Sequence, residues 1–202
     1  MSLIKNTLLV VLLLTLLGSG CSSVSVATVT PTQRPTATVD PYFASLGGGE
    51  PRTAGYWLLW NSCAPDNNAE TAKANGGREA GWYLVDDFLV DPGIKLGGLM
   101  VETCPQAIQL LQSQDGSGND QTEKLDFRLS SALLATELNL SAKAESCPAV
   151  IDAVLGSMQL LNEIGFNGVQ TDLMALVEEE QNANATIFLV SLEKYNQGDL
   201  CR

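Results

Sequence analysis

The chain has 202 residues, with 23 acidic and 11 basic side chains, a formal net charge of −12 and no histidine. Such an acidic surface repels nucleic acid and anionic lipid headgroups, which excludes nucleic acid as a partner and a basic patch as the means of membrane attachment. The absence of histidine excludes Ser-His-Asp and Cys-His nucleophiles and the usual zinc sites. A bound metal would therefore be a hard cation held by oxygen atoms.

The chain begins with a short apolar leader that ends at a cysteine. Lys5 precedes an apolar run at 8–17, which is too short to span a membrane and is typical of a signal peptide. The leader closes Leu-Leu-Gly-Ser-Gly-Cys, the layout of a bacterial lipoprotein signal. We therefore predict that residues 1–20 are a signal peptide and that Cys21 carries the lipid, with ordinary secretion after cleavage at a small residue as the alternative.

Lipidation at Cys21 would fix the location of the protein. Stable anchoring needs more than one acyl chain, such as palmitate, and a fully processed lipoprotein cysteine provides this. We expect the protein on the extracytoplasmic face of the cell envelope, with the membrane as a partner through the lipid. Residues 21–50 contain few large side chains and are predicted to form a disordered Ser/Thr/Pro/Gly stalk. Residues 51–202 have the length of one domain.

Four cysteines follow Cys21, and their even number predicts disulfides. They are Cys63, Cys104, Cys147 and Cys201. In an oxidising compartment four cysteines indicate two bridges, with three connectivities open. Because no two of them form a CxxC pair, a metal cluster or a thioredoxin-like site has little support.

The first part of the domain is aromatic, and a hairpin follows it. Rings alternate with Pro, Asn and Gly over 51–93, and periodicity does not decide between a short helix and an extended segment at 82–90. Two short apolar runs flank Gly97-Gly98 within 94–101. Since a Gly-Gly turn supplies the positive φ that tight turns need, these residues predict a small β-hairpin.

The remainder of the chain has helical periodicity. Thr103 and Gln106 form a capping box at a Thr-Cys-Pro-Gln start, and Ser-Cys-Pro at 146–148 is expected to open a helix in the same way. Apolar stripes predict further helices at about 123–138 and 171–195. The buried side of the last helix is expected to contain Leu173, Leu176, Val177, Ile187, Phe188 and Leu192.

These elements predict a mainly α fold: a disulfide-bonded bundle of about four helices with a small β-hairpin and an irregular aromatic N-terminal segment. Helices joined by short loops run antiparallel, so the end of the last helix should return beside the start of its predecessor. That order brings Cys201 towards Cys147 and leaves Cys63 for Cys104. The second bridge would pin the aromatic segment onto the bundle.

Three short patches resemble a module of secreted bacterial proteins. The patches are Gly-Tyr-Trp at 55–57, Leu-Ser-Ser-Ala-Leu-Leu-Ala-Thr-Glu-Leu-Asn-Leu at 129–140 and Leu-Glu-Lys-Tyr-Asn-Gln-Gly-Asp-Leu-Cys at 192–201. The module opens Gly-Tyr-Trp-Lys-Asn-His-Pro, contains an Ala-Lys-Leu-Asn helix and closes Leu-Asp-x-Tyr-Asn-Asn-Gly-x-x-Cys. This chain has Leu-Leu-Trp where the module has Lys-Asn-His. The resemblance implies an extracytoplasmic helical module and names no activity.

A polar loop is a candidate calcium site. Asp115, Ser117 and Asn119 place oxygen ligands at alternate positions, and Asp126 follows at a spacing that a calcium loop could use. An EF-hand, however, needs Gly at its sixth position, where this loop has Asp120. We favour a flexible Gly/Ser loop that caps the next helix through Asn119 or Asp120, with calcium as the alternative.

Aromatic side chains are a candidate sugar-binding surface. Trp57, Trp60, Trp82 and Tyr83 could stack on the rings of a polysaccharide. Aromatic residues in a loop-rich segment beside a disulfide more often form a local core, and we favour that interpretation.

Carboxylates could hydrolyse a glycoside without histidine. The candidates are Asp86, Asp87, Asp91 and Glu102, and no spacing selects a pair among them. The sequence therefore favours a noncatalytic role, in binding or display at the envelope surface, with an envelope protein or a polysaccharide as partner. A histidine-free, carboxylate-based hydrolase such as a glycosidase is the alternative.

Overall fold

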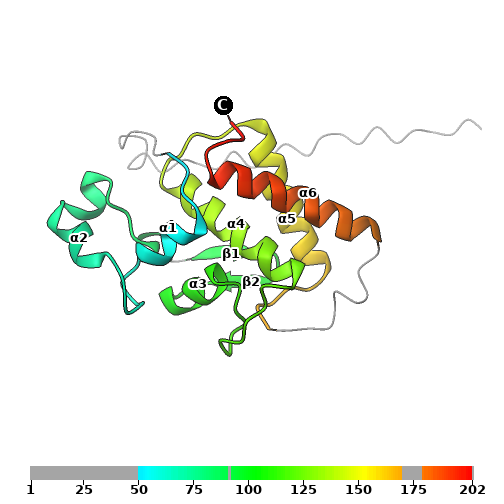
Figure 1. The fold of residues 1–202 in the computed structure, drawn as a ribbon, viewed down its shortest axis with the longest axis horizontal. Coiled ribbons are helices and arrows are strands. Elements are labelled where there is room, and N and C mark those ends of the chain that lie inside the picture. Colours follow the sequence, from blue (N-terminus) through cyan, green and yellow to red (C-terminus); the bar gives the residue numbers. More distant parts are fainter. Residues whose placement is uncertain (1–49, 91, 170–178, 202) are drawn as a thin grey trace, which may run out of the picture. The chain divides into compact units, whose positions relative to one another are not determined.

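A computed structural model of the chain describes residues 50–90, 92–169 and 179–201. The expected signal peptide, Cys21 and nearly all of the stalk lie outside the described residues. Within them the protein is mainly α-helical with one two-stranded antiparallel hairpin, as predicted (Figure 1). The helices of this part are too short or too polar to cross a membrane.

The aromatic segment is built from short helical turns. It contains α1 (Ala54–Leu59), α2 (Ala69–Ala74) and the 3-10 helices η2 (Gly77–Ala80) and η3 (Val85–Phe88). Thr53 caps α1, because its side chain accepts a hydrogen bond from the backbone N–H of Tyr56 at 3.3 Å. The segment that periodicity left undecided thus contains a 3-10 helix.

The hairpin consists of β1 (Ile94–Leu96) and β2 (Leu99–Val101), with Ile94 opposite Val101 and Leu96 opposite Leu99. Gly97 turns the chain with a φ of 60°. A Cβ atom on Gly97 would lie 2.7 Å from the carbonyl carbon of Leu161, so the turn packs closely against α5 (Pro148–Glu163). Only glycine meets both the backbone angle and the close approach.

The two predicted helix starts differ in how they are capped. α3 (Cys104–Leu111) begins with the expected capping box, in which the Thr103 N–H donates to Gln106 Oε1 at 3.2 Å. α5 begins where expected, but its N-cap is Cys147 and no side chain caps it. The expected likeness between the two starts is therefore wrong, because Thr103 before the cysteine is the N-cap of α3, whereas Cys147 itself is the N-cap of α5.

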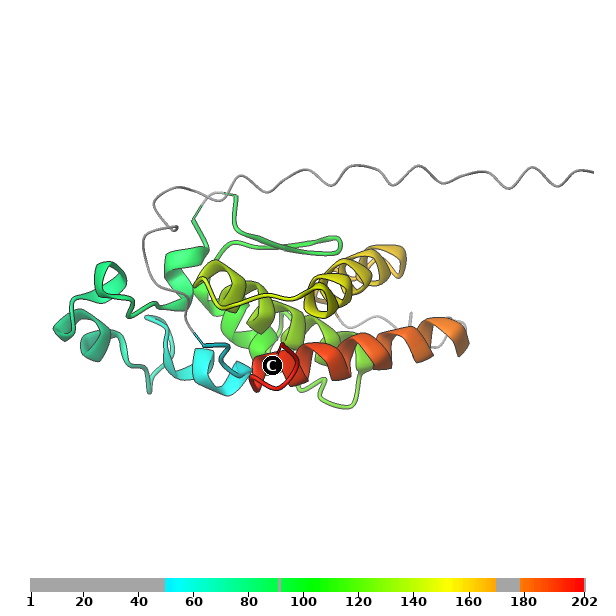
Figure 2. The same ribbon diagram turned by 90° about the horizontal axis from the view of Figure 1, so that it is seen from above.

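α4 (Leu125–Ser141) is the central helix of the domain (Figures 1 and 2). It packs against α1, α3, α5, α6 (Glu179–Asn196) and β1. Nearly all of its side chains from Asp126 to Asn139 are buried, which is why its apolar residues do not form one simple stripe. The polar residues on this helix must therefore find partners inside the protein.

The last helix buries a different face from the one expected. Ala185, Leu189, Leu192 and Tyr195 are buried, whereas Ile187 is 60% exposed. The prediction for Ile187 was wrong because the buried stripe includes the small Ala185 and the polar Asn196, which a search for large apolar residues passes over. Leu192 and the half-buried Phe188 lie as expected. Leu173, Leu176 and Val177 are outside the described residues.

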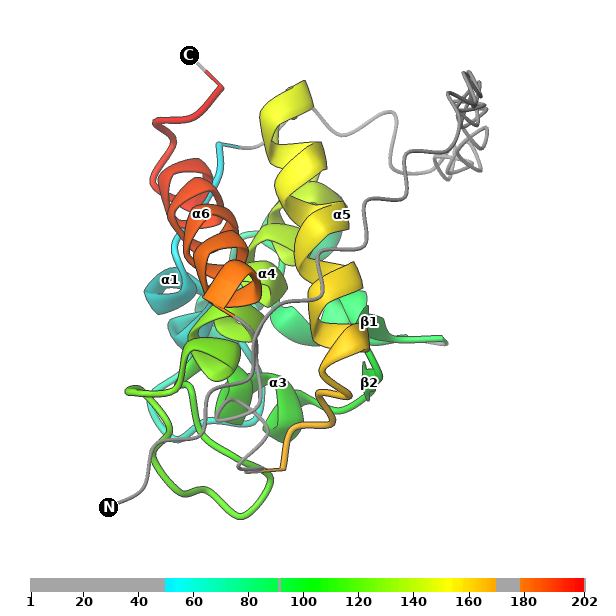
Figure 3. The ribbon, with the colours of Figure 1, turned by 90° about the vertical axis from the view of Figure 1, so that its right-hand side faces the viewer.

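Two disulfides join the elements. Cys63 is bonded to Cys104 and Cys147 to Cys201, which are the pairs expected from an antiparallel order. In Figure 3 the start of α5 and the end of α6 lie at the same end of the helix pair. The first bridge ties the aromatic segment to α3, and the second closes the α5–α6 pair.

Candidate ligand pocket beside α4 and α6

Two buried asparagines form the polar centre of the domain. Asn139 on α4 donates through Nδ2 to Oδ1 of Asn196 on α6 at 2.8 Å. The Thr136 hydroxyl lies 3.0 Å from the same oxygen, and Asn196 Nδ2 donates to the carbonyl oxygen of Ala132 at 3.0 Å. Because both amide groups are buried and bonded, their orientation is fixed.

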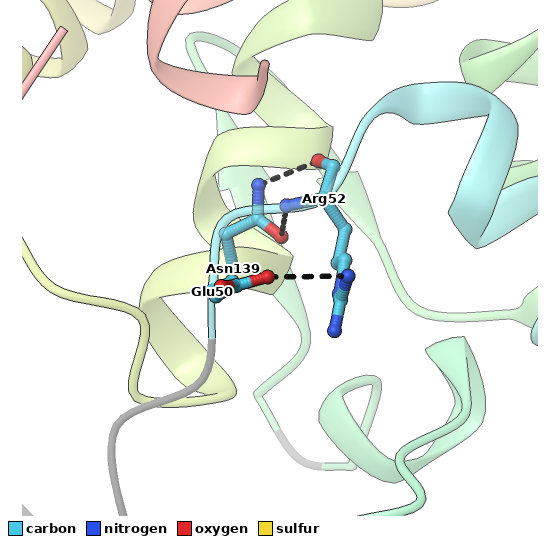
Figure 4. Close-up of polar contacts among 3 residues, drawn as sticks. All are labelled: Glu50, Arg52 and Asn139. Carbon is cyan, nitrogen blue, oxygen red and sulfur yellow. Dashed lines mark hydrogen bonds and ion pairs between the residues drawn. The ribbon is translucent and has the colours of Figure 1, made fainter. Parts of the chain in front are cut away.

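The Asn139 carboxamide also holds the N-terminal segment (Figure 4). Its Oδ1 accepts from the backbone N–H of Arg52 at 2.9 Å, and its Nδ2 donates to the Arg52 carbonyl at 2.7 Å. The same Oδ1 accepts from the indole N–H of Trp57 at 3.1 Å. Figure 4 also shows the exposed ion pair between Glu50 and Arg52, at 3.8 Å, which adds little to stability.

The three patches that carry the resemblance meet at these asparagines. Trp57 comes from 55–57, Asn139 from 129–140 and Asn196 from 192–201. The network joins segments that lie 82 and 57 residues apart in the sequence. The patches therefore have a shared structural role, which is to lock the N-terminal segment, α4 and α6 together.

A pocket of about 310 Å³ borders this network, with Asn196 in its wall. Its hydroxyl groups come from Thr53, Ser113, Thr122 and Ser131. Ala54 and Ala132 are small and leave the space open. The walls thus come from the start of α1, the loop between α3 and α4, the first half of α4, and the end of α6.

Among the described residues that line the pocket, one carries a positive charge and one a negative charge. Arg128 of α4 and Glu193 of α6 approach to 3.8 Å, and both side chains are about half exposed. A single long contact at this exposure is weak, so each group can exchange its partner for a ligand at little cost. Gln197 lines the same pocket.

Two residues of the candidate sugar-binding surface are in the core and two reach the surface. Trp57 and Tyr83 are 2% and 7% exposed, so they belong to the core, in agreement with the favoured interpretation as a local core. Trp60 and Trp82 reach the surface and stack with their centroids 5.3 Å apart. Tyr56, which sequence reasoning passed over, stacks on Trp60 at 5.5 Å.

The row of stacked rings is extended by a cation. The Arg52 guanidinium lies 5.2 Å from the Tyr56 ring centroid. Burial raises the pKa of the Tyr56 hydroxyl, and the charge of Arg52 opposes that rise. Trp60 is in contact with both Tyr56 and Trp82, so its faces are largely occupied within the protein. A ring in such a stack has less face to offer a sugar.

The candidate calcium loop is held by hydrogen bonds to Asp115. Its Oδ1 accepts from the backbone N–H groups of Ser117 and Asn119, both at 2.9 Å. Its Oδ2 accepts from the side chains of Asn119 and Gln121, at 2.9 and 3.3 Å. The hydrogen bonds from Asn119, helped by the others, lower the pKa of Asp115. Within the described ranges no three acidic or cysteine side chains cluster as metal ligands, and Asp126 instead accepts from its neighbour Phe127.

The expected cap of the next helix is also absent. The N-cap of α4 is Lys124, without a side-chain bond, whereas Asp120 accepts from the Thr122 N–H at 2.9 Å. The interpretation of 115–120 as a polar loop is thus supported, but capping by Asn119 or Asp120 was wrong.

The candidate catalytic carboxylates make local contacts. Asp86 accepts from the Ser62 backbone N–H and hydroxyl, at 2.9 and 2.7 Å, and Asp87 accepts from the Leu84 N–H at 2.8 Å. Glu102 is exposed, and Asp91 is outside the described residues. Asp86 and Asp87 therefore fix the turns around η3.

Burial raises the pKa of three further ionisable groups. Loss of hydration raises the pKa of Glu137 on α4 to about 7 and raises that of Asp126. Burial, assisted by the negative charge of Glu145, raises the pKa of Tyr195 to about 12. None of these three groups lines the pocket described above.

Comparison with known proteins adds no relative: no family model, curated protein or solved structure matches this chain. The pocket therefore has to be interpreted from its own residues.

Sequence reasoning missed Arg128, Glu193 and the asparagine pair. One signal was available for Asn139, because Thr136 and Asn139 interrupt an apolar helix at a spacing of three residues and so share a face. Arg128 and Glu193 are ordinary surface charges in the sequence. Only the packing of α4 against α6 brings them to one pocket.

Proposed function

We propose that this protein is a lipid-anchored, noncatalytic binding module on the extracytoplasmic side of the cell envelope. The disulfide pairing carries the proposal. Two bridges use Cys63, Cys104, Cys147 and Cys201, which leaves Cys21 as the one cysteine of the sequence outside them. Such bridges persist in an oxidising compartment, and Cys21 stands where a lipoprotein signal places its lipid.

The binding role is supported by the pocket beside α4 and α6. Its volume of about 310 Å³ is at the small end of the range for ligand sites. The buried asparagine network holds one wall in place before a ligand arrives, and such preorganisation lowers the entropy cost of binding. The charged pair in its lining, Arg128 and Glu193, is weak enough to be rearranged.

Membrane fractionation of cells producing the full chain or Cys21→Ala tests the anchor. We expect the wild-type protein in the membrane fraction and its N-terminal peptide, by mass spectrometry, to carry acyl groups on Cys21. The Cys21→Ala chain should lose the modification and leave the membrane fraction. Cys63→Ala with Cys104→Ala is the control, because it removes other cysteines and should leave lipidation intact.

An unmodified Cys21 in the wild-type protein would refute the anchor, as would equal membrane association of the wild-type and Cys21→Ala chains. Either result would favour ordinary secretion.

A further inference from the structure

The pocket beside α4 and α6 presents opposite charges side by side. Arg128 and Glu193 meet at 3.8 Å through one nitrogen and one oxygen, and each side chain is about half exposed. The guanidinium has five N–H donors, and the carboxylate can accept several bonds, so most of their capacity is unused in this contact. The pair can bind one ligand through both charges at once.

A ligand for this pair should carry both charges close together. An α-amino acid has its ammonium and carboxylate groups on the same carbon atom, so its carboxylate can face Arg128 while its ammonium group faces Glu193. A simple anion would meet Glu193 and a chain of net charge −12, and a simple cation would meet Arg128. A ligand with both charges avoids both repulsions.

The rest of the pocket limits the size and polarity of this ligand. The volume of about 310 Å³ is small for an oligosaccharide or a folded peptide. Among the described residues that line it, none is aromatic, so a sugar ring has no face on which to stack. Hydroxyl groups of Thr53 and Ser113 and the amide of Gln197 can bind a polar side chain.

We propose that this pocket binds a free, polar α-amino acid as its zwitterion, with Arg128 bound to the carboxylate and Glu193 to the ammonium group. This inference rests on the proposed function as a binding module and names its ligand class. Gln197 directly follows α6, and its backbone N–H donates to the Glu193 carbonyl at 3.0 Å, so its side chain is placed to contact the ligand side chain.

Isothermal titration calorimetry of the full chain in detergent tests the ligand class. L-serine and L-glutamine are titrated beside ethanolamine, which lacks the carboxylate, glycerate, which lacks the ammonium group, and D-glucose, which is uncharged. We expect saturable binding of at least one of the two amino acids. Ethanolamine and glycerate should each bind about tenfold or more weakly, because each loses a charge-assisted contact.

Charge-removing variants test the site. Arg128→Gln and Glu193→Gln should each weaken amino-acid binding about tenfold or more. Both side chains are half exposed, so the thermal midpoint should stay near that of the wild type. Lys73→Gln and Glu70→Gln are matched controls on the separate helix α2 and should bind as the wild type does.

Any of the following results would overturn the inference. The first three are no binding of either amino acid, equal binding of serine and its two analogues, and unchanged binding by both charge variants. Glucose binding that depends on Arg128 would also overturn the ligand class, while leaving a binding module. The lipid anchor is tested separately by the Cys21→Ala fractionation.

Discussion

The indole N–H of Trp57 donates to Oδ1 of Asn139 at 3.1 Å, across 82 residues of sequence. Both residues are buried, and the same oxygen accepts from the Arg52 backbone. One carboxamide thus ties the first helical turn of the domain to its central helix. Through Nδ2 it reaches Asn196, and so the last helix as well.

Replacement of Asn139 should therefore destabilise the whole domain. In Asn139→Ala the buried Trp57 indole and the part-buried Arg52 amide lose their acceptor, and we expect the free energy of unfolding to fall by about 3 kcal/mol. Urea unfolding followed by tryptophan fluorescence measures the loss. Asn162→Ala, at an exposed position on α5, is the control and should change stability by less than about 0.5 kcal/mol. An equal, small loss in both variants would contradict the role of Asn139.

The hairpin turn offers a second test. An added side chain has two costs there, the strain of a positive φ and a steric clash, and a second glycine allows them to be separated. Gly97 has a positive φ and a close approach to the Leu161 backbone, whereas Gly118 has a positive φ of 82° with open space around its Cβ position. Gly118→Ala should cost about 1 kcal/mol from the backbone angle alone. Gly97→Ala adds a clash with α5, and we expect it to lower the free energy of unfolding by about 3 kcal/mol or more. Similar losses in thermal or urea unfolding would show that the turn does not pack against α5.

Local signals account for what could be predicted of the fold. The Gly-Gly turn, the Thr103 capping box and the cysteine positions each act over a few residues or through chain order, and the structure agrees with them. The face of α6 could not be predicted in the same way. Its buried stripe uses Ala185 and Asn196, and Asn196 is buried only because α4 supplies Thr136 and Asn139 as partners.

The pocket could not be predicted from the sequence for the same reason. Arg128 and Glu193 look like solvated charges in a chain rich in carboxylates, and their meeting depends on how two helices pack. For the aromatic candidates, composition identified a cluster of rings, but composition does not say which members are buried. Trp57 is in the core because Asn139 provides an acceptor for its indole.

The disulfides should contribute equally to stability, since they close loops of similar length. The sequence separations of 41 and 54 residues correspond to about 4 kcal/mol each in the chain-entropy treatment. We therefore expect each of two double variants to lose about 4 kcal/mol of unfolding free energy in urea. The variants are Cys147→Ala with Cys201→Ala, and Cys63→Ala with Cys104→Ala. Non-reducing peptide mapping of the wild type is the control, and a Cys63–Cys147 or Cys63–Cys201 peptide would refute the pairing.

Calcium should have little effect on this protein. Both oxygens of Asp115 already accept N–H groups, and a cation at this loop would have to displace them. We expect millimolar calcium chloride to shift the thermal midpoint no more than magnesium chloride at the same ionic strength. A rise specific to calcium, and lost in Asp115→Asn, would restore the loop as a metal site.

Stability should fall between about pH 4.5 and pH 7 because of Glu137. Its pKa rises from 4.5 to about 7 on folding because burial removes water from the carboxylate. Below pH 4.5 both states are protonated and there is no cost. As the pH rises, the unfolded chain ionises first, so unfolding becomes easier until the folded group ionises near pH 7. The shift corresponds to a loss of about 3 kcal/mol.

Glu137→Gln keeps the shape of this side chain and removes its charge. Its free energy of unfolding at pH 8 should therefore exceed that of the wild type by up to about 3 kcal/mol, while the two proteins should be similar at pH 4. Urea unfolding at both pH values measures the difference. Glu70→Gln, at an exposed position on α2, is the matched control and should leave the difference between pH 4 and pH 8 as it is in the wild type. If Glu137→Gln shows the wild-type dependence on pH, then water reaches the Glu137 carboxylate in the folded protein and the group is not desolvated.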